Sequence, residues 1–183
     1  MGEGNCPNCY RWEALAGARA AFEMAGPARR VVHGLKFRGI RELAAHMAEA
    51  LQPLVDELRP DAIFPTPFHR GRRRRRGFNQ AEVLLNRLAR PAVAGRLDRI
   101  RDTASQVGLR ERERRRNVAG AFRYRGPELS GLTLALLDDV VTTGATAEEC
   151  ARVLRDHGAE RVYALAYARA SYAPDPTTGQ SPD

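Results

Sequence analysis

The sequence has almost no lysine, few cysteines and few aromatic residues. Lys36 is the only lysine, so nearly all of the 30 basic side chains are arginine. Three cysteines are a low, odd count, which argues against a disulfide-stabilised scaffold. No apolar run approaches the roughly 20 residues that span a bilayer. The first five residues also lack the basic-then-apolar order of a signal peptide. We therefore expect a cytoplasmic protein without a membrane partner.

The charge balance is strongly positive, at +8 with a pI near 10.2. Guanidinium groups bind phosphate in a bidentate way, so phosphorylated small molecules and nucleic acid are both suitable partners. A GC-rich genome would explain the scattered arginines equally well. The chain has 183 residues, 43% of them hydrophobic, which suits one domain with its own core.

The apolar pattern predicts an α/β fold with a mostly parallel central sheet flanked by helices. Apolar residues recur at helical spacing over 41–58, 78–89 and 145–157, and 13–24 also has helical composition. Short apolar runs at 61–65, 132–137 and 162–168 predict buried strands. We expect a helical N-terminal segment over 1–30, a main domain over 31–172, and a disordered tail over 173–183 that is rich in Pro, Thr, Gly and Ser.

Two acids follow the apolar strand predicted over 132–137. In open α/β sheets, ligands bind beyond the carboxyl ends of strands. Asp138 and Asp139 would stand at such an end, where two carboxylates can accept hydrogen bonds from a vicinal diol such as that of ribose. The alternative is that the acids merely end a strand and a threonine caps the next helix.

The turn after the acids has the composition of a phosphate site. Free backbone N–H groups and the helix dipole favour a phosphate at the start of a helix. Gly144 would let the backbone come close, and nearby threonine hydroxyls can donate to phosphate oxygens. The residues predicted to bind the phosphate are Val141, Thr142, Thr143, Gly144, Ala145 and Thr146. One loop would then hold both ends of a ribose 5-phosphate.

The string over 136–146 resembles the phosphoribosyl-pyrophosphate (PRPP) signature of type I phosphoribosyltransferases. Further blocks, taken in order, resemble the ComF/GntX family of competence-associated phosphoribosyltransferase-like proteins; they lie at 34–39, 64–69, 76–81, 103–106 and 115–122. The resemblance runs from about residue 31 to 169. It implies a type I phosphoribosyltransferase fold, PRPP as ligand and Mg²⁺ with it. It also implies substitution at C1 of the ribose, with pyrophosphate leaving and a nitrogen acceptor attacking.

The resemblance also implies further site residues. A pyrophosphate-binding loop would include Thr66, Pro67, His69 and Arg70. The family block and a mobile loop would contribute Arg76, Asn79, Gln80, Gln106, Arg116 and Asn117. The arginines over 72–75 are equally typical of a solvated basic loop, and 110–114 of a charged exposed helix. The role of Lys36 stays open.

Thr142 departs from one branch of the resembled enzymes. Salvage enzymes that take purine bases commonly carry an acid at this position, where it assists proton transfer. Threonine cannot do so near neutral pH. The sequence therefore disfavours a purine-salvage role and leaves the acceptor undetermined.

Cys6 and Cys9 form one C-x-x-C pair near the start of the chain. A structural zinc site needs four ligands, and this pair supplies two. Similar proteins carry a second such pair upstream. The alternatives are a truncated start, a site lost in this lineage, a site shared between chains, or no metal at all.

Three functions compete. The first is an active phosphoribosyltransferase. The second is a non-catalytic PRPP- or nucleotide-binding partner of DNA uptake or recombination proteins. The third is binding of single-stranded DNA through the arginine runs. No aromatic residue interleaves the run from Arg70 to Arg76, so stacking platforms are not evident there, and the third ranks last.

Overall fold

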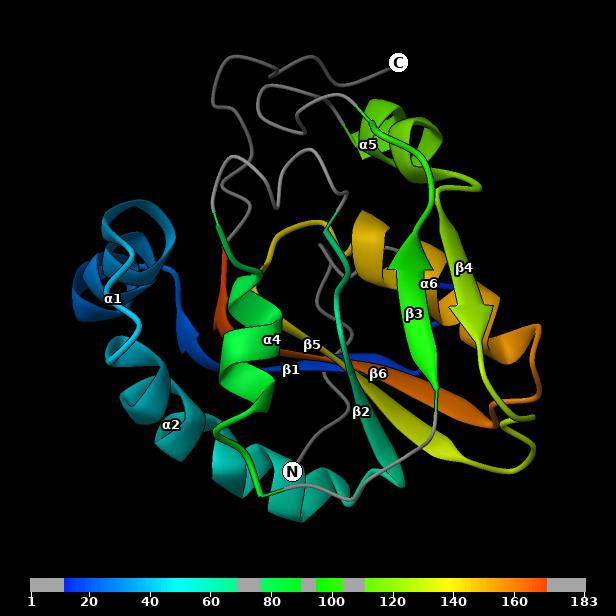
Figure 1. Cartoon of the computed structure of the whole chain (residues 1–183), viewed down its shortest axis with the longest axis horizontal. Helices are drawn as coiled ribbons and strands as arrows, with labels where there is room; N and C mark the ends of the chain where they lie inside the picture. The colour runs from blue at the N-terminus through cyan, green and yellow to red at the C-terminus, as the bar shows by residue number, and fades with distance from the viewer. Residues whose placement is uncertain (1–11, 69–76, 90–94, 104–110, 171–183) are drawn as a thin grey trace, which may run out of the picture.

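A parallel four-stranded sheet forms the centre of the protein (Figure 1). The computed structural model describes residues 12–68, 77–89, 95–103 and 111–170. The strand order is β1-β6-β5-β2, with every neighbouring pair parallel. Their bounds are β1 Gly17–Glu23, β2 Ala62–Pro65, β5 Thr133–Val141 and β6 Arg161–Arg169. The central strands read as continuous apolar runs because both faces of the sheet are covered.

Helices cover one face, and a helix with a short antiparallel strand pair covers the other (Figure 1). The first layer contains α1 Gly26–Arg38, α2 Leu43–Leu58 and α4 Gln80–Leu85. The second contains α6 Ala145–Arg155 and an antiparallel pair, β3 Arg96–Arg99 with β4 Phe122–Arg125. Helix α5, Glu111–Val118, lies in the connection between β3 and β4. Among the described residues, no helix is both long and apolar enough to cross a membrane.

Alternation along β5 divides the interior into two apolar cores. Leu134 and Leu136 face α6 and the β3–β4 pair, while Ala135 and Leu137 face α1, α2 and α4. All four are essentially closed to solvent. The period-2 geometry of a strand therefore sends the acids that follow toward opposite layers as well.

The α/β fold predicted from the apolar pattern is confirmed, and so are the helix over 41–58 and the strand over 61–65. The helix predicted over 78–89 is shorter, because α4 begins only after its cap at Asn79. The strand predicted over 132–137 is longer, since β5 continues to Val141 and includes both acids. The β3–β4 pair was not predicted.

The helix predicted over 13–24 is wrong. This segment forms β1, an edge strand that pairs in parallel with β6 from Gly17 opposite Tyr163 to Glu23 opposite Arg169. Its alanines have high helix propensity, but propensity is a weak preference that tertiary pairing overrides. The N-terminal segment therefore contributes a strand to the central sheet, and α1 starts only at Gly26.

Candidate functional site

The two acids follow Leu137 on β5, the residue that pairs with Pro65 at the end of β2, so they lie at the same edge of the sheet as the end of β2. The carboxylate of Asp138 accepts a hydrogen bond from the backbone N–H of Asp139 at 2.8 Å. The Asp139 side chain is only 4% exposed, and its Oδ1 lies 2.9 Å from Lys36 Nζ on α1. Lys36 thus pairs with Asp139, one of the two acids predicted to bind a diol.

The environment of Asp138 favours its neutral form. Burial is the main cause that raises the pKa of this carboxyl well above its ordinary value, and the charge of Asp139 raises it further. Lys36 acts in the opposite direction and lowers the pKa of Asp138. The pKa of Asp138 therefore depends on both its burial and the charges next to it.

The phosphate-type turn follows directly. Val141 is buried at the end of β5, Thr142 is exposed, and α6 begins at Ala145. Gly144 precedes the helix with φ of +76°, a conformation that favours glycine. The Thr143 hydroxyl accepts a long, 3.5 Å hydrogen bond from the N–H of Ala145. Thr146 lies in the first turn of α6 and is partly buried. The turn thus links the strand that carries the acids directly to the start of α6.

An N-terminal segment over residues 12–15 covers this turn, which the sequence gave no reason to expect. The indole N–H of Trp12 donates to the carbonyl of Thr143 at 3.4 Å. The Glu148 carboxylate on α6 accepts from three consecutive backbone N–H groups, those of Glu13, Ala14 and Leu15, at 2.8, 2.9 and 3.1 Å. One acidic side chain therefore fastens the segment to the helix that carries the phosphate turn.

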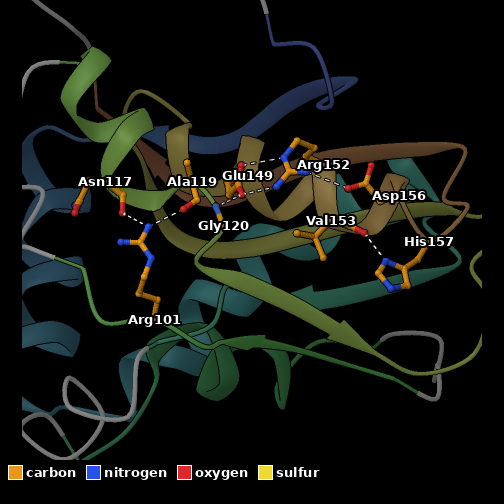
Figure 2. Close-up of polar contacts among 9 residues, drawn as sticks. All are labelled: Arg101, Asn117, Ala119, Gly120, Glu149, Arg152, Val153, Asp156 and His157. Carbon is orange, nitrogen blue, oxygen red and sulfur yellow. Dashed lines mark hydrogen bonds and ion pairs between the residues drawn. The ribbon is translucent and has the colours of Figure 1, made fainter.

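Helix α5 approaches the turn from the β3–β4 connection. The Arg114 guanidinium donates to the Thr142 hydroxyl at 3.2 Å. Figure 2 shows what holds the end of α5: Arg101 donates to the carbonyls of Asn117 and Ala119, at 3.2 and 2.6 Å. The Glu149 carboxylate accepts from the N–H of Gly120 at 2.6 Å. The cationic side chain of Arg114 is thereby placed at the turn. From sequence, the mixed charges of 110–114 were equally typical of an exposed helix and of a functional loop.

The predicted pyrophosphate segment begins beside the acids. The N–H of Thr66 donates to the carbonyl of Leu137 at 2.8 Å, one residue before Asp138. Asn79 fixes this segment, since its amide donates to the carbonyl of Thr66 and its Oδ1 accepts from Ala81, both at 3.0 Å. Asn79 therefore has a structural task as the α4 cap.

Gln80 and a cavity lie near the same segment. Gln80 is 1% exposed, and neither of its amide atoms has a hydrogen-bond partner among the described residues. A cavity of about 580 Å³ opens between β2 and the β3–β4 pair. Its lining includes Pro67, Phe68, Arg96 and Ile100.

The remaining predicted residues are placed as follows. Arg116 is exposed on α5, and Asn117 is partly buried at the end of that helix. Six predicted site residues lie outside the described part of the chain: Cys6, Cys9, His69, Arg70, Arg76 and Gln106. Within the described part, no group of three or more His, Cys, Asp or Glu side chains could hold a metal ion.

The chain is an α/β protein whose candidate site lies at the carboxyl edge of a parallel sheet. The chain is 36% identical to the DNA utilization protein YhgH of Salmonella typhi over 172 residues, 86% of this chain and 74% of that protein. It is 38% identical to competence protein F of Haemophilus influenzae over 117 residues, 61% of this chain and 51% of that protein. The competence protein ComFC of Bacillus subtilis is 26% identical over 163 residues, 84% and 67% of the two chains. The chain therefore belongs to the ComF-like family of competence and DNA utilization proteins.

No protein-family model matches the chain. Solved structures resemble it only distantly. An orotate phosphoribosyltransferase of Mycobacterium tuberculosis in complex with PRPP has a TM-score of 0.43 at 17% identity, over 80% of this chain and 89% of that one. A phosphoribosylpyrophosphate synthetase of Mycobacterium smegmatis has a TM-score of 0.41 at 20% identity, over 70% and 34%.

Proposed function

We propose that the chain binds PRPP at the carboxyl edge of its sheet and transfers the phosphoribosyl group to a nitrogen acceptor. Pyrophosphate is released, and the reaction serves the uptake or use of DNA. One observation carries the proposal: a single continuous segment places Asp138 and Asp139 next to a glycine turn that opens α6. Carboxylates suit the ribose hydroxyls, and free N–H groups at a helix start suit the 5′-phosphate.

The residues around this segment suit the charge changes of the reaction. The ribose gains positive character as pyrophosphate leaves, so nearby carboxylates stabilise it. Arg114 at the turn adds a guanidinium, which binds phosphate oxygens well. Thr66 and Pro67 follow β2 next to Asp138, where the leaving pyrophosphate would lie. No covalent nucleophile is needed for direct substitution at C1.

Mg²⁺ fits this site as a companion of the pyrophosphate. The described residues gather no cluster that would hold a metal alone, but Asp138 offers hard oxygen ligands. Mg²⁺ is commonly bound by one or two carboxylates together with substrate phosphates. When bound, the ion would neutralise charge that develops on the leaving group.

The names of the relatives favour a second candidate function. They describe DNA utilization and competence, and none of them names an enzymatic activity. The alternative is therefore a protein that binds PRPP without transferring it and acts through a DNA-processing partner. The same edge of the sheet would serve as the binding site.

Calorimetry with PRPP and Mg²⁺ tests the binding step. Wild type should bind, and Asp138→Asn should bind at least about tenfold more weakly, because one carboxyl oxygen that can accept from a ribose hydroxyl is replaced by an amide nitrogen that cannot. Asp156→Asn is the matched control, since that carboxylate is 59% exposed at the far end of α6. Wild type without measurable PRPP binding would refute the proposal.

Release of pyrophosphate separates the two candidates. Ammonia, amines, purines and pyrimidines would be offered as acceptors to the PRPP-bound protein. Turnover with any of them, lost in Asp138→Asn, supports the transferase. Binding without turnover supports the non-catalytic partner. A single-stranded DNA affinity that falls steeply with salt and survives in Asp138→Asn would instead indicate the arginine surface.

A further inference from the structure

The only lysine of the chain forms an ion pair with the second acid of the site. Lys36 lies in the last turn of α1, and its Nζ contacts Asp139 Oδ1 at 2.9 Å. The lysine side chain is 22% exposed and the aspartate 4%. A nearly buried carboxylate requires such a partner, because an isolated buried charge is strongly unfavourable.

The other oxygen of the same carboxylate is unsatisfied. Asp139 Oδ2 is closed to solvent and has no hydrogen-bond partner among the described residues. A buried acceptor left in this state is destabilising, so it favours any group that can donate to it. Asp138 beside it is partly exposed. The pair therefore offers acceptors to a ligand that carries adjacent hydroxyls.

The use of lysine here is informative because arginine is used almost everywhere else in the chain. A guanidinium forms a planar fork that engages both oxygens of a carboxylate. An ammonium is a compact point charge that can hold one oxygen alone. Lysine thus compensates the charge of Asp139 and still leaves Oδ2 without a partner among the described residues, whereas a guanidinium would engage both oxygens.

We propose that Lys36 is the positioning residue of the ribose site, holding Asp139 by Oδ1 so that Oδ2 accepts a ribose hydroxyl. This inference rests on the proposed binding of PRPP and deepens it. Lys36 acts through Asp139 and does not itself contact the reacting atoms. The role accounts for a contact between α1 and β5 that the phosphate turn alone does not require.

Binding of PRPP, ribose 5-phosphate and inorganic phosphate tests the inference in Lys36→Arg and Lys36→Met. Both variants should bind PRPP and ribose 5-phosphate about tenfold more weakly, while inorganic phosphate, held by the turn alone, binds as before. Arg38→Met is the control, because it removes an exposed positive charge from the same turn of α1 and should change nothing. Thermal unfolding checks that each variant folds, and Lys36→Arg keeps the charge in case Lys36→Met does not.

Two results would overturn the inference while leaving the proposed function intact. Lys36→Arg could bind ribose 5-phosphate like wild type, which would show that Lys36 only compensates charge. Alternatively, inorganic phosphate could weaken as much as ribose 5-phosphate, which would show a general disturbance of the site. Failure of wild type to bind PRPP would refute the proposed function and this inference with it.

Discussion

At the scale of single residues, Gly144 is the position on which the phosphate turn most depends. Its φ of +76° is uncommon for residues with a side chain. A Cβ placed there would also lie 2.9 Å from the indole nitrogen of Trp12, closer than real contacts allow. Backbone conformation and the covering N-terminal segment therefore both require glycine.

Gly144→Ala should lower the free energy of unfolding by about 2–3 kcal/mol, from the left-handed backbone and the Trp12 contact together. Gly131 gives a matched control, since it has the same φ of +76° with open space around its Cβ. Gly131→Ala should lower the free energy of unfolding by about 1 kcal/mol, because only the backbone conformation is strained there. Urea denaturation of both variants measures the difference. Equal losses would mean that Trp12 does not constrain the turn.

The residues of the site differ in how far the sequence could predict them. Asp138 and the turn at Gly144 could be predicted because they lie in one short segment. In that segment a strand is followed directly by a helix, so the acids and the turn come at the same edge of the sheet. Lys36 could be singled out by its rarity, but its pairing with Asp139 depends on how α1 packs against the sheet. Trp12 and Glu148 carried no signal, since a lone tryptophan and a helical glutamate are ordinary residues.

At the scale of elements, the segment over 12–15 behaves as a strap over the start of α6. Its own side chains contribute two buried residues, Ala14 and Leu15, to the core around α6. Its backbone is fixed by the single carboxylate of Glu148. Hydrogen bonds to a charged acceptor are the stronger kind, and three of them converge here.

Glu148→Ala should release the strap and lower the free energy of unfolding by about 2–3 kcal/mol. Trp12 is the only tryptophan, so its fluorescence reports directly on the strap, and emission should shift to longer wavelength as the indole becomes exposed. Glu57→Ala, an exposed change on α2, should alter stability by no more than about 0.5 kcal/mol and leave the emission unchanged. Unshifted emission in Glu148→Ala would show that the strap is held by its apolar contacts alone.

Elements with a strong apolar pattern were predictable, and those defined by pairing were not. Helix α2 and strand β2 carry enough buried side chains to dictate their conformation. Strand β1 has small residues of high helix propensity, and its strand geometry comes from six register pairs with β6. Helix α5 has a mostly charged sequence, and its placement depends on Arg101 and Glu149 beyond its own bounds.

At the scale of the whole molecule, the candidate site lies where the two apolar cores meet. The sheet separates a layer containing α1, α2 and α4 from a layer containing α6 and the β3–β4 pair (Figure 1). Asp139 is tied to the first layer through Lys36, while Asp138 and the turn belong to the second. Ligand binding at this edge would therefore connect both layers. The continuous apolar run over 132–137 predicted that both faces of this strand are covered, but not which element supplies the cation.

The burial of Asp138 makes the free energy of unfolding depend on pH. Because its pKa is raised in the folded protein, the folded state holds this proton more tightly than the unfolded chain does. The free energy of unfolding should therefore fall as pH rises from the ordinary pKa of 3.8 through the raised value. The neutral side chain of Asp138→Asn escapes this loss and can still accept from the N–H of Asp139. At pH 8 the variant should be more stable than wild type, by about 0.5–2 kcal/mol as for other single stabilising substitutions, although it binds PRPP more weakly.

Urea denaturation at several values between pH 4 and pH 8 checks this prediction. The advantage of Asp138→Asn should shrink as pH falls toward the ordinary pKa of 3.8, because the unfolded chain then also begins to bind this proton. Asp156→Asn should show no such trend, because its carboxylate is largely exposed. A variant less stable than wild type at pH 8 would mean that the Asp138 charge is favourable in the folded protein. Lys36 would then outweigh burial at this site, and the ion pair would stabilise both acids of the edge.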